Sequence, residues 1–205
     1  MKNEFLLKVI NQLKKNQQFP KYQLERRLDI FINTFLPEII QWKFGSEYHV
    51  DFIIPELPIK KDGNYQSTNL DYFAACNSQN KGFLVELKTD PHSCRADQFN
   101  LYLKVQKNGF GKIIKDIRTI KDSPHNRYRK KYEYLLSVLE SGKVDLNIDL
   151  EIIYILPEAG IQRLSKNLQD SNQTVHFITL ESLRSSIVTS SFQEEWDIIW
   201  SSNLF

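Results

Sequence analysis

The stretch FLVELKTD, residues 83–90, decides the fold because it places two charges inside a core strand. Apolar residues at 83, 84, 85 and 87 are typical of a strand that is buried on both faces. Glu86 and Lys88 interrupt this pattern, and a buried charge costs several kcal/mol unless another group pairs with it. Residues two apart in a strand point to the same face. The carboxylate and the ammonium are therefore expected to lie side by side, and their burial requires an explanation.

Length and composition limit the classes of protein to which the chain can belong. Its 205 residues, 41% of them hydrophobic and 25% charged, predict a single domain over residues 1–205 with a substantial core. No run approaches the roughly 18 apolar residues that cross a bilayer, so no membrane partner is expected. Residues 1–16 form an amphipathic helical pattern without the apolar core of an export signal, which predicts a cytoplasmic protein.

Cysteine content and net charge exclude further classes. Cys76 and Cys94 are too few for a disulfide framework or a four-thiolate metal centre, and they are interpreted as reduced thiols. The net charge of +2 is too small to indicate a nucleic-acid partner by itself. The distribution of charge along the chain is more informative than the total.

Hydrophobic periodicity predicts the order helix, three strands, helix, strand. Pro37 is expected to interrupt the first helix, and Pro55 and Pro58 suit a bent or edge strand. Asn108 and Gly109 are expected to end the second helix. The elements are expected at residues 21–36 (helix), 48–54, 69–76 and 83–90 (strands), 95–107 and 112–140 (helices), 150–156 and 175–180 (strands) and 192–200 (helix).

A second acid is expected to meet Glu86. Asp71 is a lone charge in the preceding strand, and a hairpin would bring it beside Glu86. Two carboxylates held close in a core repel unless a cation lies between them. Magnesium suits this position because it binds one or two carboxylates and keeps several waters. Beside such a metal, Lys88 could orient or help deprotonate a water and offset the charge that builds on a phosphate.

Two helices carry further polar side chains at interior positions. Glu25 falls at the helical angle of Ile32 and Leu36, inside the apolar stripe of residues 21–36. Gln98 and Tyr102, four residues apart, share the apolar face of residues 95–107. A polar site shared with the strands accounts for all of these side chains together.

On these residues the sequence resembles the PD-(D/E)XK nuclease superfamily. The resemblance lies in the order of elements and in Asp71 followed fifteen residues later by Glu86-Leu87-Lys88. Gln98-Phe99-Asn100-Leu101-Tyr102 resembles the Q-x-x-x-Y helix motif of the RecB-type exonuclease branch, and Glu25 matches an acid on the first core helix. Leu70 stands where the family pattern has proline. The resemblance covers roughly residues 21–156.

This resemblance implies a fold and an activity. The fold is α/β, with a restriction-endonuclease-like core (αβββαβ), a mixed central sheet flanked by helices, and extra N- and C-terminal helices. The activity is hydrolysis of DNA phosphodiester bonds, with Mg²⁺ or Mn²⁺ held by Asp71, Glu86 and Glu25. Lys88 is then the catalytic lysine, and Gln98 and Tyr102 support the site or the DNA strand. A homodimer is compatible with the class, and any motor would be a separate protein because the chain has no helicase-type phosphate loop.

The charge pattern after residue 111 suggests where DNA binds. Residues 112–131 contain eight cations and two acids, with tyrosines at 128 and 132. Such a segment can hold phosphates of single- or double-stranded DNA while aromatic rings stack on exposed bases. The residues expected to bind nucleic acid are Lys121, Arg127, Arg129, Lys130 and Lys131.

Each of these assignments has a structural alternative. Glu86 and Lys88 could be an ordinary strand ion pair, and Asp71 could bond turn backbone. Gln98 and Tyr102 could be a core tyrosine with its hydrogen-bond partner, and the basic segment could be a solvated helix surface. For the whole chain the alternatives are a catalytically silent nuclease fold that binds nucleic acid or a protein partner, and an unrelated α/β binding protein.

Overall fold

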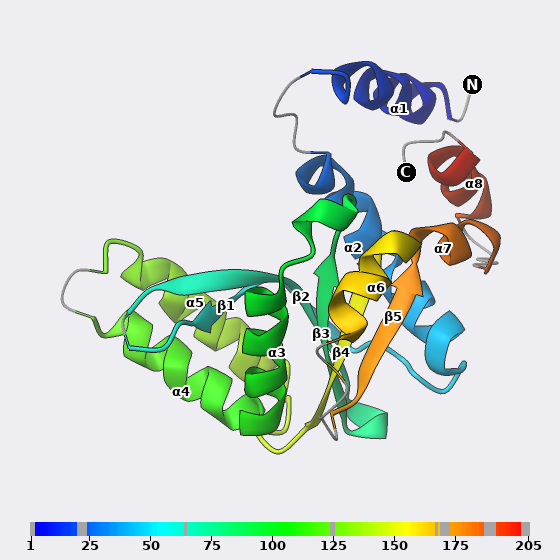
Figure 1. Ribbon diagram of the computed structural model, residues 1–205. Coiled ribbons are helices and arrows are strands. Elements are labelled where there is room, and N and C mark those ends of the chain that lie inside the picture. Colours follow the sequence, from blue (N-terminus) through cyan, green and yellow to red (C-terminus); the bar gives the residue numbers. More distant parts are fainter. Residues whose placement is uncertain are drawn as a thin grey trace.

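A five-stranded mixed sheet is the centre of the fold (Figure 1). The computed structural model describes residues 3–19, 24–63, 65–123, 126–166, 168, 173–186 and 192–201, except for the side chains of 184–186. The strand order is β1-β2-β3-β4-β5, in which β1, β2 and β3 are antiparallel and β4 and β5 run parallel to β3. The strands are β1 (Phe52–Lys60), β2 (Ser67–Cys76), β3 (Lys81–Leu87), β4 (Asp149–Leu156) and β5 (Val175–Thr179).

Helices cover both faces of this sheet (Figure 1). The core on one face includes α2 (Glu25–Phe44), α7 (Leu180–Ser186), α8 (Gln193–Ser201) and α1 (Glu4–Asn16), of which α1 lies beside α8 and away from the sheet (Figure 1). The other face packs against α3 (Ala96–Asn108), α4 (Phe110–Lys121), α5 (Arg129–Ser141) and α6 (Glu158–Ser165). Two short 3₁₀ helices, η1 (Asn77–Gln79) and η2 (Pro91–Ser93), complete the described elements. None of the described helices combines the length and apolar character that crossing a membrane requires.

The central position of β3 explains the apolar run of residues 83–87. Phe83, Val85 and Leu87 belong to the core on the α2 side, whereas Leu84 belongs to the core on the α3 side. Glu86 alternates with these residues and therefore points with Leu84 toward α3. The prediction of a strand buried on both faces is confirmed, although β3 already ends at Leu87.

The prediction that Pro37 interrupts the first helix is wrong. α2 runs without a break to Phe44, and its described part begins at Glu25, so the expected start at residue 21 lies outside the described residues. An interior proline costs about 3 kcal/mol. Phe35, Leu36, Ile39 and Ile40 are all buried around it, and each contributes about 1.5–3 kcal/mol. Burial therefore outweighs the proline penalty.

Several element boundaries also differ from the predictions. The first strand begins at Phe52 rather than at residue 48, and the long basic helix is two helices, α4 and α5. The helices α6 and α7 were not predicted. The expected end of the second helix is confirmed, because Gly109 adopts a φ of 79° there, which glycine tolerates without strain. Cys76 and Cys94 are free and buried, as expected.

A charged cluster joins the first residues of the three parallel strands, far along β3 from Glu86. The Lys81 ammonium contacts Asp149 at 2.5 Å and also pairs with Glu151. Glu151 is nearly buried and its carboxylate lies 2.6 Å from Nε2 of His176, whose ring meets the edge of Phe44. The bond with His176, followed by Lys81, lowers the pKa of Glu151 below its ordinary value of 4.5.

Replacing Glu151 by glutamine is expected to destabilise the fold in a pH-dependent way. A lowered pKa means that the ionised carboxylate stabilises the folded state above pH 4.5 and that this contribution disappears as the pH falls below it. Urea unfolding at pH 7 should show a loss of about 1–3 kcal/mol, and the loss should shrink in acid. Asp149→Asn, at the exposed end of the same cluster, is the control and should cost about 0–1 kcal/mol. An equal loss of unfolding free energy at pH 7 and in acid would contradict this account.

Candidate active site

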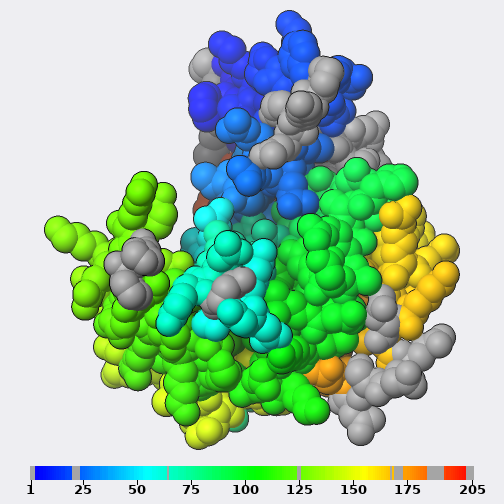
Figure 2. Space-filling view, turned by 60° about the vertical axis from the view of Figure 1, so that its left-hand side comes forward, coloured from blue at the N-terminus to red at the C-terminus, as the bar shows by residue number. Residues whose placement is uncertain are grey.

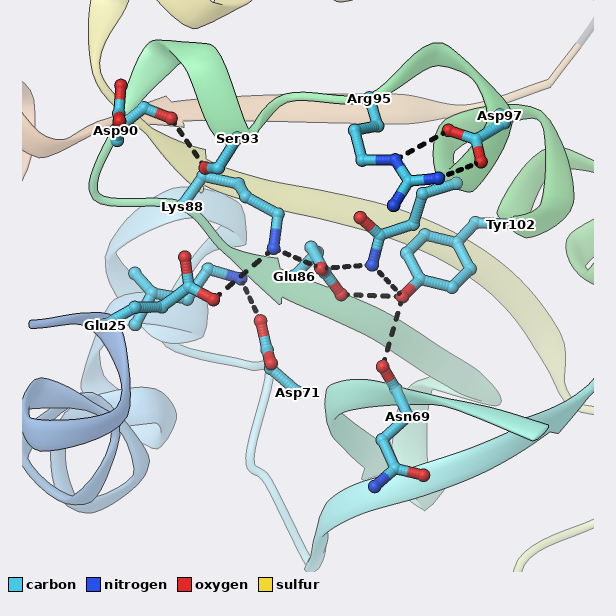
Figure 3. A network of polar contacts seen from close by, with 12 residues as sticks. Glu25, Asn69, Asp71, Glu86, Lys88, Asp90, Ser93, Arg95, Asp97 and Tyr102 are labelled. Atoms are coloured by element: carbon cyan, nitrogen blue, oxygen red, sulfur yellow. Dashed lines mark hydrogen bonds and ion pairs between the residues drawn. The ribbon is translucent and has the colours of Figure 1, made fainter. Parts of the chain in front are cut away.

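The predicted site residues converge where β2 separates from β3 (Figure 3). The pairing of these strands ends at Tyr72 and Val85. Beyond that point the N–H of Leu87 donates to Oδ2 of Asp71 at 2.7 Å, so a side-chain oxygen replaces the next strand carbonyl. On its other side β3 stays attached to β4, because the N–H of Lys88 donates to the carbonyl of Ile155 at 2.8 Å.

A bend in the β1–β2 hairpin brings Asp71 to this position. The two strands pair on either side of Glu56 and Asp71 but not at these residues, and Glu56 has a φ of 51°. Ile54 and Leu57 contact the same core although they are an odd number of residues apart, so the hairpin turns over between them. A non-glycine residue with positive φ costs about 1–3 kcal/mol, and such strain concentrates at functional sites.

Glu86 is the buried centre of the site. Its side chain is 1% exposed, and three donors surround its carboxylate. Lys88 Nζ and Gln98 Nε2 both lie 2.6 Å from Oε1, while the Tyr102 hydroxyl donates to Oε2 at 2.8 Å. A buried carboxylate with this many donors is paired and hydrogen-bonded, which is the condition for its presence in a core.

Gln98 and Tyr102 form a donor chain that ends on Glu86. Gln98 Nε2 also lies 2.9 Å from the Tyr102 hydroxyl oxygen, which accepts from it. The single tyrosine proton has two acceptors in reach, Glu86 at 2.8 Å and the carbonyl of Asn69 at 3.4 Å, and the shorter contact is to Glu86. The structure thus brings both predicted helix residues to the site, and both also serve as core hydrogen-bond partners.

Lys88 links the central strand to α2 across the site. It is 6% exposed, and its ammonium lies between Glu86 and Glu25, which is 3.5 Å away at the first turn of α2 (Figure 3). Burial lowers the pKa of Lys88, but the two carboxylates outweigh burial and raise the pKa above its ordinary value. The ammonium therefore stays protonated at neutral pH.

The site carries more negative than positive charge. Three carboxylates, on Glu25, Asp71 and Glu86, face one ammonium. Burial, followed by the charge of Glu86, raises the pKa of Asp71 to about 7. Burial also raises the pKa of Glu86. Both carboxylates are thus short of positive charge, which a bound cation would supply.

The predicted metal ligands fit a hard divalent cation in part. Within the described part of the chain, no three His, Cys, Asp or Glu side chains form a ready-made metal site. Glu25, which was also expected to be a ligand, lies 3.5 Å from the Lys88 ammonium, and its role as a ligand stays a prediction. Asp71 and Glu86 remain as two oxygen donors, which is the set that Mg²⁺ uses when waters and substrate phosphates supply its other ligands.

An open cleft gives access to these side chains. It has a volume of about 410 Å³ and is the recess between α2, the β1–β2 hairpin and the segment that leads into α3 (Figure 2). Tyr102 lies behind the cleft and does not line it. Sequence reasoning missed Arg26, Glu56 and Asn69 as lining residues, because nothing in the periodicity indicated the hairpin bend. The lining residues are Glu25, Arg26, Asp29, Glu56, Ser67, Thr68, Asn69, Asp71, Tyr72, Glu86, Leu87, Lys88 and Gln98.

The predicted nucleic-acid-binding residues surround the connection between α4 and α5. Lys121 ends α4 and lies 3.4 Å from Asp122, which Arg129 also approaches at 3.8 Å. Arg127 and Lys130 are exposed, and the Lys131 ammonium lies 5.4 Å from the ring centre of Tyr128. The first turn of α5 contains cations and no acid. These cations lie at the positive end of the helix dipole, which is unfavourable for them. These residues lie outside the cleft, beside a second cavity described below.

Comparison with known proteins adds no assignment. No protein-family model, no curated protein and no solved structure matches the chain. The function is therefore inferred from the residues of the site.

Asp71→Asn is expected to stabilise the metal-free protein at high pH. A raised folded-state pKa means that Asp71 contributes stability below its ordinary value of 3.8 and that this contribution is lost as the pH rises through about 7. With EDTA at pH 8, the variant should be more stable than the wild type by about 1–2 kcal/mol, after allowance for partial solvent screening. The difference should be smaller at pH 5.

The same variant tests metal binding without an activity assay. Mn²⁺ should raise the melting temperature of the wild type and have little effect on Asp71→Asn, because a ligand stabilises only the state that binds it. Asp197→Asn, an exposed change in α8, is the control and should respond as the wild type does. Equal metal responses in all three proteins would remove Asp71 from the metal site.

Proposed function

We propose that the protein is a metal-dependent nuclease of the PD-(D/E)XK class that hydrolyses phosphodiester bonds in DNA. The observation that carries this proposal is the convergence of Asp71, Glu86 and Lys88 on one open cleft. The element order α2-β1-β2-β3-α3 followed by β4 supports a restriction-endonuclease-like core. The residues of the expected motif thus follow one another in the sequence and also lie together in space.

Asp71 and Glu86 are the residues that would hold Mg²⁺ or Mn²⁺. When bound, such an ion supplies Lewis-acid stabilisation of the charge that builds on the reacting phosphate. Glu86 is held in one orientation by Tyr102 and Gln98, so its carboxylate is positioned before substrate arrives. Asp71 is fixed by the Leu87 N–H, which donates to Oδ2, and Oδ1 accepts no hydrogen bond from the part of the chain that the structure describes.

Lys88 acts through its charge in this proposal. Because its pKa is raised, it is protonated at neutral pH and stabilises the negative charge of the phosphate rather than accepting a proton. Glu25 holds the ammonium from the side of α2 and is a positioning residue. Lys88 and the two carboxylates together give a site that needs both a cation and an anionic substrate.

One observation favours the alternative of a silent nuclease fold that binds nucleic acid or a protein partner. Both oxygens of Glu86 already have donors, and Lys88 occupies the position next to them. In a silent protein this network would be a structural ion pair that closes the core. The two functions differ in whether the carboxylates accept a metal.

Cleavage assays should separate these functions. The wild type, supplied with Mg²⁺ or Mn²⁺, is expected to cut plasmid or single-stranded DNA, and EDTA should stop the reaction. Lys88→Met and Asp71→Asn should each lower the rate at least about 100-fold, because each removes charge stabilisation at the reacting phosphate. The control is Lys107→Met, which removes the same charge from an exposed position on α3 and should retain the rate.

Binding measurements decide the remaining outcomes. All variants should remain folded and bind DNA in a salt-dependent way. Salt-dependent binding with no cleavage in either metal would select the silent nuclease fold. The absence of both binding and cleavage would select an unrelated α/β protein.

A further inference from the structure

A second cavity, which we call the tyrosine cavity, lies beside the candidate active site. It has a volume of about 480 Å³, within the range of small-ligand sites. It is bounded by the loop before β2 and by the α4–α5 connection, between the cyan hairpin and the yellow-green start of α5 in Figure 2. Its lining residues are Tyr65, Gln66, Ser67, Ile120, Ser123, Asn126, Arg127, Tyr128 and Tyr132.

Aromatic rings are exposed at this cavity and are held in place. Tyr65 is 59% exposed and Tyr128 is 62% exposed, and both rings line the same cavity. The Asn126 side chain donates to the carbonyl of Ile120 at 2.9 Å and accepts from the N–H of Tyr128 at 2.8 Å. The side chain of Asn126 therefore joins the backbone at Tyr128 to the last turn of α4.

The charges around the cavity are mainly positive. Among the described residues, Asp122 contacts Lys121 and Arg129, and Glu133 contacts Arg129. Arg127 and Lys130 have no ion pair within that part of the chain, and Lys131 stacks on Tyr128. An anionic chain that carries flat rings would match both the charges and the exposed aromatic faces.

The tyrosine cavity adjoins the active-site cleft. Ser67 lines both, and β2 leads from it directly to Asp71. Four residues of extended strand span about 13 Å. A strand that lies along β2 can therefore reach both places at once.

We propose that the tyrosine cavity binds unpaired bases of a single nucleic-acid strand whose phosphate backbone continues along β2 to Asp71. This inference deepens the proposed function, on which its second half rests, by naming single-stranded DNA as the substrate class. Stacking needs an uncovered base face, and in a duplex the neighbouring pairs cover both faces of each base. The cavity therefore discriminates against fully paired DNA.

Fluorescence anisotropy in EDTA tests this inference without any cleavage. The probes are a fluorescein-labelled 20-nucleotide single strand and the duplex of the same sequence. The wild type should bind the single strand at least about fivefold more tightly. A Tyr65→Ala, Tyr128→Ala double variant should lose at least about tenfold for the single strand, because each stacked base contributes roughly that factor. Its affinity for the duplex should change little.

Two further variants distinguish stacking from a general loss of structure. Tyr65→Phe with Tyr128→Phe keeps both rings and should retain single-strand affinity. Tyr134→Ala removes a tyrosine of α5 that is 72% exposed but does not line the cavity. This variant should bind as the wild type does. Melting temperatures of all variants should match the wild type, since the substituted rings are exposed.

The outcomes separate this inference from the proposed nuclease activity. Equal affinity for both probes, or an alanine variant with wild-type affinity, would overturn the inference even if the protein cleaves DNA. Loss of single-strand binding in the alanine variant alone would support it even if no metal produces cleavage. No binding of either probe would overturn it and leave the cavity to a protein partner.

Discussion

The structure depends on one buried carboxylate in its central strand. Glu86 is surrounded by core residues and is acceptable there only because Lys88, Gln98 and Tyr102 reach it. Loss of a partner from a buried ion pair costs about 3–5 kcal/mol, so these donors constrain how α3 lies on the sheet. Lys88 in turn draws the first turn of α2 toward the strand through Glu25. A single charge thus fixes two helices relative to β3.

The remaining charge imbalance points to a ligand rather than to stability. An apolar residue at position 86 would avoid the cost of burying a charge, and it would remove the carboxylate that, after burial, does most to raise the pKa of Asp71. The strained φ of Glu56 and the cations at the start of α5 are further local costs on the same side of the molecule. Local rules that are broken together in one region are typical of functional sites.

The sequence predicted much of the site but not its precise shape. The period of two in residues 83–87 and the spacing of Gln98 and Tyr102 are local signals, and both side chains reach Glu86 as expected. The prolines at 55 and 58 predicted a bent or edge strand, and β1 is both an edge strand of the sheet and bent at Glu56, but nothing in the sequence indicated that the bend would bring Asp71 to the Leu87 N–H. Pro37 was misjudged because tertiary burial overrode local propensity. Tyr65 was missed because a single aromatic residue in a loop belongs to no helical or strand periodicity.

The hairpin bend also explains why two unlike surfaces adjoin. On one side of Asp71, β2 pairs with β3 and belongs to the central sheet, and on the other side it pairs only with β1 and packs with the α4–α5 layer. β2 therefore carries Asp71 of the candidate active site and, four residues earlier, Ser67 at the edge of the tyrosine cavity. Ser67 and Asp71 lie on the same extended strand, so the separation of these two residues is set by strand geometry. A substrate strand that is bound at the tyrosine cavity would present its phosphates to Asp71 at a fixed distance.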